Sequence, residues 1–260
     1  MFYKIDRTKK IKKTDIDNDV YSTLSWWEKD DESVYGLHKM NTIRVNYLHR
    51  CFNKYSKINP SILDIGCGGG ILTEEIYRLL PNSKIIGIDI DANSIEHARL
   101  HAKEMNLSIK YIVGSAYKIN IDEKFDYIVM SDVLEHLDDL PLAIQNMSNL
   151  LKPNGVFIFD TFNRTFSSWF YSIFLAQNII GLLPRKTHDW TLFITPDELS
   201  TILNNNYCEL IDINGFDTNI PIIDIIKFFF FKTIPRMFFN YTSTYNSQYF
   251  GTAIKKDMNL

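Results

Sequence analysis

The segment Asp64-Ile65-Gly66-Cys67-Gly68-Gly69-Gly70 carries the strongest chemical signal in the chain. Glycines permit backbone dihedrals that are closed to other residues, and they let the main chain approach a ligand closely. The next apolar run, 84–89, ends on Asp89, where a carboxylate can take both hydroxyls of a ribose. The glycine segment and Asp89 together predict a nucleoside-binding site.

Two kinds of nucleoside compete for this pattern. A dinucleotide site uses GxGxxG and places a pyrophosphate at the N-terminus of the following helix. This chain instead has GxGxG, from Gly66 to Gly70, with Asp64 just ahead of it. A carboxylate there disfavours a pyrophosphate and suits the ammonium group of an amino-acid moiety. The pattern therefore favours a nucleoside that carries an amino acid over a nicotinamide dinucleotide.

A second group of chemically competent residues, Asp132, Glu135 and His136, follows the apolar run 125–130. If this segment is helical, spacings of three and four place the three side chains on one face. Two carboxylates and an imidazole suit a divalent metal, and His188 from a later loop could complete the set. Asp132 followed three residues later by Glu135 is equally a capping box, which would leave His136 as a partly buried polar residue. Both interpretations remain open at this stage.

The elements that must position these residues alternate short apolar runs with longer amphipathic ones. This alternation is typical of a parallel α/β sheet, because crossover helices connect parallel strands. Helices are expected at 71–80, 93–105, 140–151 and 196–204. Seven strands are expected, at 61–65, 84–89, 109–113, 125–130, 155–161, 208–214 and 249–254.

Length and composition are those of one globular domain. The chain has 260 residues, 45% of them hydrophobic, with a formal net charge of -3. We expect a basic flexible tail over 1–20 and a single domain over 21–260, which begins with a helical cap at 21–58. This cap is expected to contain two helices, at 21–27 and 37–52. Apolar lid segments are expected at 162–190 and 218–247. The tail is expected to be solvated, with contact to anionic lipid as the alternative.

Composition also excludes several classes of function. The basic residues of the first 14 positions leave an acidic remainder, which is a poor general surface for nucleic acid, so no nucleic-acid partner is expected. No apolar run reaches the length of a spanning helix, and no secretory signal is visible. Three widely spaced cysteines form no metal-binding pattern and favour a reducing, cytoplasmic location.

Several segments together resemble one family of class I S-adenosylmethionine-dependent methyltransferases, the O-methyltransferases of the ubiquinone pathway. The glycine loop alone indicates only a methyltransferase, whereas the Asn-Arg-Thr and His-Asp-Trp elements are more specific to the family. The resemblance implies a Rossmann-like α/β fold with a mostly parallel seven-stranded sheet. The matching segments are Trp26-Trp27, Leu37-His38-Lys39-Met40-Asn41 with Arg44, the loop 64–70 with Ile71-Leu72, Leu134-Glu135-His136, Thr161-Phe162-Asn163-Arg164-Thr165, and Thr187-His188-Asp189-Trp190 with Phe193.

The resemblance assigns roles to individual residues. It implies that Arg44 holds the carboxylate of S-adenosylmethionine, that Gly66 passes beneath it, and that Asp89 binds the ribose. The backbone near Ser131 would line the side from which the methyl group leaves. The full expected cofactor set is Arg44, Asp64, Gly66, Gly68, Asp89, Ile90, Ser115, Ala116 and Ser131.

Similarity to enzymes with a Glu-x-x-Glu-His motif also implies a divalent metal, magnesium or zinc. The expected catalytic and metal-binding residues are Asp132, Glu135, His136 and His188. A cation touching both oxygens of a catechol would favour the phenolate, while His136 or His188 accepts the proton.

Two apolar segments lie outside the sheet pattern. Residues 165–180 predict an amphipathic helix that either lies in a lipid interface or forms a lid over the site. Residues 220–240 contain too many charges to span a membrane, and they predict a second lid, an interfacial element, a tunnel for a hydrophobic tail or a dimer interface.

The sequence thus predicts an O-methyltransferase that acts on a phenol or quinol hydroxyl of a polyprenylated ubiquinone precursor. The expected location is cytoplasmic, peripheral on the inner face of the membrane. The alternatives are a methyltransferase of the same fold with another small-molecule acceptor, and a cofactor-binding or lipid-binding module without activity.

Overall fold

A twisted sheet of eight strands, in the order β3-β2-β1-β4-β5-β8-β6-β7, organises the protein. The computed structural model describes residues 5–28, 31–180, 186–231 and 233–257. The first five strands in this order are parallel, whereas β8, β6 and β7 pair antiparallel. The strands are β1 (Ser61–Ile65), β2 (Lys84–Asp89), β3 (Ile109–Val113), β4 (Phe125–Ser131), β5 (Leu151–Phe162), β6 (Cys208–Asn219), β7 (Phe238–Thr242) and β8 (Gln248–Lys255).

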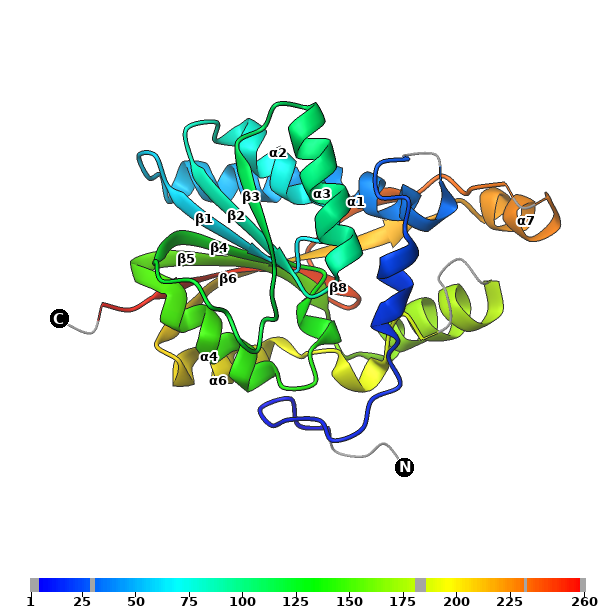
Figure 1. The fold of residues 1–260 in the computed structure, drawn as a ribbon. Helices are drawn as coiled ribbons and strands as arrows, with labels where there is room; N and C mark the ends of the chain where they lie inside the picture. The colour runs from blue at the N-terminus through cyan, green and yellow to red at the C-terminus, as the bar shows by residue number, and fades with distance from the viewer. Residues whose placement is uncertain (1–4, 29–30, 181–185, 232, 258–260) are drawn as a thin grey trace.

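Helices cover both faces of the sheet (Figure 1). One apolar core lies between the sheet and α4 and α6, and a second lies between the sheet and α1 and α2. The longer helices are α1 (Glu32–Lys54), α2 (Ile71–Leu79), α3 (Ala92–Glu104), α4 (Leu140–Leu150), α6 (Pro196–Asn205) and α7 (Ile222–Phe231). The short or irregular helices are η1 (Asn18–Thr23), η2 (Leu134–His136), α5 (Phe166–Ser168), the π-helix η3 (Trp169–Ile180) and η4 (Trp190–Leu192).

The α/β class and the mostly parallel sheet are confirmed, but the expected count of seven strands is wrong. The eighth strand, β7, lies inside the segment 218–247 that was expected to form a lid. Among the described residues it pairs with β6 alone, and β6 continues to Asn219 and so provides the additional edge. The aromatic residues of this segment concealed the strand, because they suit a lid and a strand equally well.

The N-terminal cap also differs from the expected pair of helices at 21–27 and 37–52. The first is a 3-10 helix, η1, and the second, α1, begins earlier, at Glu32. Asp31 sets this start, because its side chain accepts a hydrogen bond of 2.8 Å from the Ser33 backbone N–H.

The basic N-terminal segment lies against the domain. Arg7 is completely buried, and its Nη2 donates to the carbonyl of Leu137 at 2.6 Å. The expectation of a solvated tail is therefore wrong for Arg7, whereas the side chains of Lys9 and Lys10 are 78% and 58% exposed. The same Nη2 also lies 3.4 Å from the carbonyl of Leu134, so Arg7 supplies a donor at the end of η2.

Two glycines provide a matched test of packing. A Cβ at Gly251 in β8 would lie 2.2 Å from the Phe159 ring, whereas at Gly36 in α1 it would meet Met237 at 3.5 Å, an ordinary contact. Gly251→Ala should lower the free energy of unfolding by about 1–3 kcal/mol. Gly36→Ala should raise it by about 0.5–1 kcal/mol, because alanine favours a helix. Urea unfolding followed by circular dichroism measures both, and a Gly251→Ala variant as stable as the wild type would contradict the packing.

A candidate active site at the carboxyl edge of the sheet

A cavity of about 330 Å³ lies at the carboxyl ends of β1, β2 and β4. This is the edge at which ligands bind in open α/β sheets. Val133 and Tyr21 also face it. All nine residues of the expected cofactor set line it: Arg44, Asp64, Gly66, Gly68, Asp89, Ile90, Ser115, Ala116 and Ser131.

The glycine turn forms the floor of this cavity. Gly66, Gly68 and Gly70 have φ values of 77°, 52° and 86°, in the left-handed region that favours glycine. A Cβ at Gly66 would lie 2.3 Å from the Val133 side chain. Asp89 stabilises the turn, because its Oδ2 accepts a hydrogen bond of 2.8 Å from the Gly68 N–H. Asp89 therefore shapes the turn and also presents a carboxylate to the cavity.

Asp64 presents a second carboxylate at the end of β1. It is buried, and its Oδ2 accepts a hydrogen bond of 2.6 Å from Thr73 Oγ1. Burial, helped by the charge of Asp89, raises the pKa of Asp64 to about 7. A positively charged group in the cavity would stabilise the ionised form, which suits an ammonium ligand.

Arg44 of α1 reaches the sheet edge and is shared by two carboxylates. Its Nη2 lies 3.0 Å from Asp160 Oδ2 on β5 and 3.2 Å from Asp132 Oδ2. Its Nε is buried and has no hydrogen-bond partner among the described residues, so the guanidinium keeps a donor for a ligand. Sequence reasoning missed Asp160, although an acid within an otherwise apolar strand was a usable signal.

Asp132 does not cap a helix. Its φ is 58°, the N-cap of η2 is Val133, and that end has no side-chain capping bond. The capping-box interpretation is therefore wrong, because the chain turns sharply after β4 and η2 has only three residues. Burial opposes ionisation of Asp132, but the Arg44 charge overcomes it and lowers the pKa of this carboxyl to about 2.

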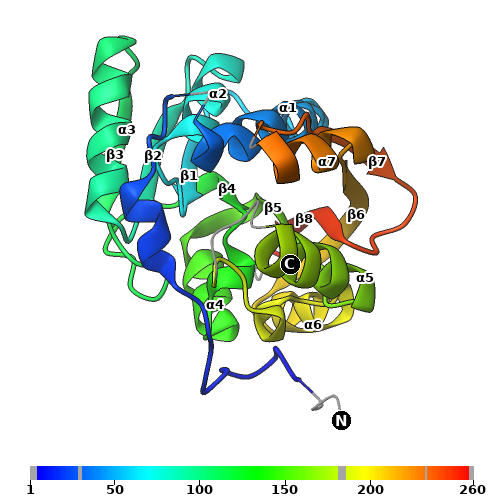
Figure 2. The ribbon, with the colours of Figure 1, turned by 90° about the vertical axis from the view of Figure 1, so that its right-hand side faces the viewer.

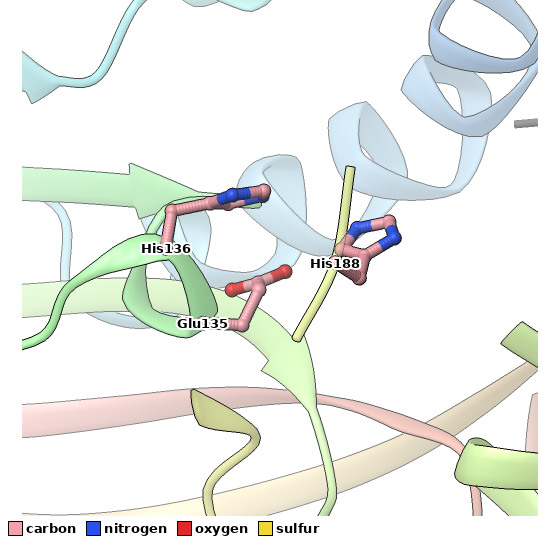
Figure 3. A group of neighbouring side chains, drawn as sticks. All are labelled: Glu135, His136 and His188. Atoms are coloured by element: carbon pink, nitrogen blue, oxygen red, sulfur yellow. The ribbon is translucent and has the colours of Figure 1, made fainter. Parts of the chain in front are cut away.

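Glu135, His136 and His188 form a compact cluster beside the cavity (Figure 3). One potential ligand atom from each lies within 4.8 Å of the other two. Asp132, the fourth residue of the expected metal set, is not part of this group, because it pairs with Arg44. His136 and Asp132 line the cavity, so the cluster and the cavity share a wall.

Three buried atoms of this cluster lack hydrogen-bond partners in the described part of the chain: Glu135 Oε1, His136 Nδ1 and His188 Nδ1. Buried polar atoms normally have partners, and each exception asks for an explanation. A carboxylate and two imidazoles are a ligand set that zinc accepts in proteins, whereas magnesium prefers oxygen ligands. The donor set therefore fits a divalent cation.

Burial and neighbouring charges shift the pKa values of all three cluster residues. Burial and the Asp132 charge raise the pKa of Glu135 well above its usual value, which favours the protonated form of this carboxyl. Burial lowers the pKa of His136 to about 3, and it also lowers the pKa of His188. Neutral imidazoles are available as ligands, and a cation would displace the Glu135 proton.

Tyr21 completes the wall of the cavity, and no sequence pattern predicted its role. Its hydroxyl lies 3.3 Å from His136 Nε2, and the two rings meet edge to face. Because Nε2 faces Tyr21, Nδ1 of the same ring is left for the cluster. Trp27, in the same N-terminal segment, stacks on the His101 ring. Its indole N–H donates to the Gly69 carbonyl at 3.0 Å, so this segment is anchored to the glycine turn.

The raised pKa of Asp64 predicts a pH dependence of stability. The folded state binds this proton more tightly than the unfolded state, so the stabilisation is complete below about pH 4 and is lost as the pH rises toward 7. Between pH 4 and 7, the free energy of unfolding of Asp64→Asn should fall by up to about 4 kcal/mol less than that of the wild type. Asp122→Asn, at an exposed position, should show the same decrease as the wild type. Urea unfolding of the ligand-free protein at pH 4 to 7 measures the slope, and equal slopes for wild type and Asp64→Asn would contradict the assignment.

The chain matches known methyltransferases in sequence and in fold. A family model described as a methyltransferase domain matches residues 56–206. The ubiquinone biosynthesis O-methyltransferase of Pelagibacter ubique is 36% identical over 218 residues, which are 81% of this chain and 90% of the relative. The protein of the same name from Bartonella bacilliformis is 36% identical over 219 residues, 80% of this chain and 87% of the relative.

The solved structures agree in fold. An S-adenosylmethionine-dependent methyltransferase from Clostridium acetobutylicum superposes with a TM-score of 0.60 at 16% identity, covering 82% of this chain and 91% of that one. The fold is thus that of the class I methyltransferases. On the identity and coverage of its relatives, the chain belongs to the ubiquinone biosynthesis O-methyltransferase family and is an S-adenosylmethionine-dependent methyltransferase.

Proposed function

We propose that this enzyme methylates a phenolic hydroxyl of a polyprenylated ubiquinone precursor, with a divalent cation held by Glu135, His136 and His188. The observation that carries the metal is the set of three buried ligand atoms without partners, next to the cofactor cavity. The names of the relatives support the acceptor class. S-adenosylmethionine supplies an electrophilic methyl group when bound.

In this proposal the cavity residues bind and orient the cofactor. Asp89 accepts hydrogen bonds from the ribose, Arg44 donates to the carboxylate, and Asp64 faces the ammonium group. Asp160 keeps Arg44 at the edge of β4 and β5, so the donor is preorganised rather than solvated. Holding both reactants in one orientation provides much of the rate enhancement of a methyl transfer.

The cluster would address the weak nucleophilicity of the acceptor. A phenol has a pKa of about 10, so only about one molecule in a thousand is the phenolate at neutral pH. A cation at Glu135, His136 and His188 would supply Lewis-acid stabilisation of the phenolate. The pKa of His136, about 3, makes this side chain a poor proton acceptor, so the structure favours its role as a ligand over the role as a base.

Complementation tests the acceptor. The chain, expressed in a bacterial strain that lacks ubiquinone O-methylation, should restore ubiquinone, with the methylated intermediates identified by mass spectrometry. If a well-expressed protein binds S-adenosylmethionine but methylates only water-soluble phenols, the acceptor proposal is wrong and the methyltransferase assignment stands.

Removal of one cluster ligand tests the metal. His188→Ala should weaken zinc binding to the purified protein by about 10- to 100-fold and lower kcat on a catechol by a similar factor. Excess metal should restore part of the activity, since two ligands remain. His49→Ala, at an exposed histidine of α1, is the matched control. Isothermal titration with zinc reports binding without turnover, and unchanged affinity in His188→Ala would refute the metal site.

Tyr21→Phe tests whether the hydroxyl orients His136. The ring stays, but the 3.3 Å contact to Nε2 is lost. We expect kcat to fall about three- to tenfold, with the KM for S-adenosylmethionine changed less than about twofold. Tyr207→Phe, at an exposed tyrosine, is the control. Steady-state kinetics with a catechol acceptor measure both constants, and a variant with wild-type kcat would show that the contact is incidental.

A further inference from the structure

Arg7 is a completely buried cation. Its Nε and Nη1 have no hydrogen-bond partner in the described part of the chain, and its Nη2 donates there to main-chain carbonyls rather than to a carboxylate. Burial and the nearby charge of Arg164 lower the pKa of Arg7 to about 10. Taking a charge out of water without a bonded counter-charge is costly. The role of this side chain therefore lies in the hydrogen bonds that Nη2 makes.

The guanidinium of Arg7 holds the backbone of η2 from outside. Its Nη2 donates to the Leu137 carbonyl at 2.6 Å and lies 3.4 Å from the Leu134 carbonyl. These two carbonyls lie on either side of Glu135 and His136, the cluster residues that η2 carries. A hydrogen bond from a charged donor is stronger than one between neutral groups. Arg7 therefore fixes the main chain directly beside two of the three cluster residues.

η2 has little internal support. It contains three residues, and its N-terminus has no side-chain capping bond. Its backbone bonds run from the His136 N–H to the Val133 carbonyl at 2.9 Å and from the Leu137 N–H to the Leu134 carbonyl at 3.4 Å. Bonds of this 3-10 type have poorer geometry than those of an α-helix. An element this short takes its position from its surroundings, so loss of the Arg7 contact should displace it.

Arg7 is fixed in turn by Glu198 at the start of α6. The Arg7 backbone N–H donates to Glu198 Oε1 at 3.1 Å, and Glu198 belongs to the capping box of α6. Arg164 pairs with the same oxygen and donates to the Phe193 carbonyl at 2.8 Å. The Phe193 ring lies edge to face with the His188 ring, with 6.0 Å between the centroids. Glu198 thus connects Arg7 to the side of the cluster that His188 occupies.

The chain that follows Arg7 reaches the loop that carries His188. The Asp15 N–H donates to Asp189 Oδ2 at 2.8 Å, and the Asp17 N–H donates to the Lys186 carbonyl at 2.9 Å. These two bonds lie on either side of His188 in the sequence. Figure 2 shows the N-terminal segment running past α4 toward α3. One segment therefore contacts both of the elements that supply cluster residues.

The His188 loop is also held from η3. This helix is rich in apolar residues, but no helix in the described part of the chain has the length and apolar character needed to cross a membrane. Gln177 of η3 is buried and accepts a hydrogen bond of 3.0 Å from the His188 N–H. It also donates to the His188 carbonyl at 3.4 Å. The loop is thus fixed by η3 and by the N-terminal segment, whereas η2 relies on its contacts with Arg7 and the sheet.

We propose that residues 7–17 form a strap that sets the spacing of the Glu135, His136 and His188 cluster, and that Arg7 is its positioning residue. The proposal rests on the proposed function, in which this cluster binds a cation. A cation accepts its ligands only within about 0.2 Å of their ideal distances. A small displacement of η2 therefore weakens binding although every ligand is still present.

Arg7→Met separates positioning from stability. Methionine fills the buried space but has no donor, and the relief of a buried charge should offset the lost hydrogen bonds, so the urea midpoint should stay near that of the wild type. Zinc affinity and kcat on a catechol should each fall about tenfold. The KM for S-adenosylmethionine should change less than about twofold, because Arg7 does not line the cofactor cavity. Lys9→Ala, at a 78% exposed cation of the same segment, is the matched control.

Chemical rescue gives a second measurement. Arg7→Ala leaves a space of the size of the side chain, and millimolar guanidinium should enter it and restore part of the zinc affinity. The same concentration of sodium chloride should have no effect. Hydrogen–deuterium exchange of the peptide that contains η2, measured without zinc, should be faster in both Arg7 variants and unchanged in Lys9→Ala.

Wild-type zinc affinity in Arg7→Met would overturn the proposal. So would a loss of affinity in Arg7→Met that appears only together with a lower urea midpoint, because this result would indicate a general loss of structure. If the wild type itself binds no zinc, the cation site of the proposed function fails. Exchange at η2 then decides separately whether Arg7 holds this element, and unchanged exchange would overturn the strap as well.

Discussion

The buried guanidinium of Arg44 is the interaction on which the site depends. It comes from the cap helix α1 and lies beside two carboxylates. Asp132 directly follows β4, and Asp160 lies near the end of the neighbouring strand β5. Burying one cation between two anions is costly unless each charge keeps its partners, so loss of the arginine would leave two carboxylates close together without compensation. Asp132 has a positive φ, and η2, which carries Glu135 and His136, begins two residues after it. One ion-pair network thus links the cofactor cavity to the cluster.

Most of the sheet and the cofactor cavity could be predicted from the sequence because they depend on local signals. The glycine turn needs positive φ values that glycine supplies, and parallel strands place their carboxyl ends at one edge, so Asp64, Asp89 and Ser131 had to approach one another. Arg44 required a family resemblance, because an isolated arginine on a helix has no local signature.

Other features depend on tertiary contacts that no local pattern reveals. Asp132 and Glu135 have the spacing of a capping box, but the sheet edge and Arg44 override that local preference. Tyr21 and Asp160 act through partners 115 and 116 residues away in the chain. Strand β7 is an exposed edge element with a mixed pattern, so its apolar residues indicated only an element outside the core.

The polar cavity and the exposed apolar side chains of α7 and η3 lie in different parts of the molecule. The proposed acceptor is hydrophobic and the cofactor is charged, so the two need different environments. The cavity lies where the glycine turn and charged side chains provide polar contacts, whereas α7 and η3 place apolar side chains outward on one side. His188 stands at the junction, because Gln177 ties its backbone to η3 while its ring faces Glu135 and His136. The buried polar side chain of Gln177 is therefore not a packing defect, because it supports the backbone of the cluster residue His188 from η3.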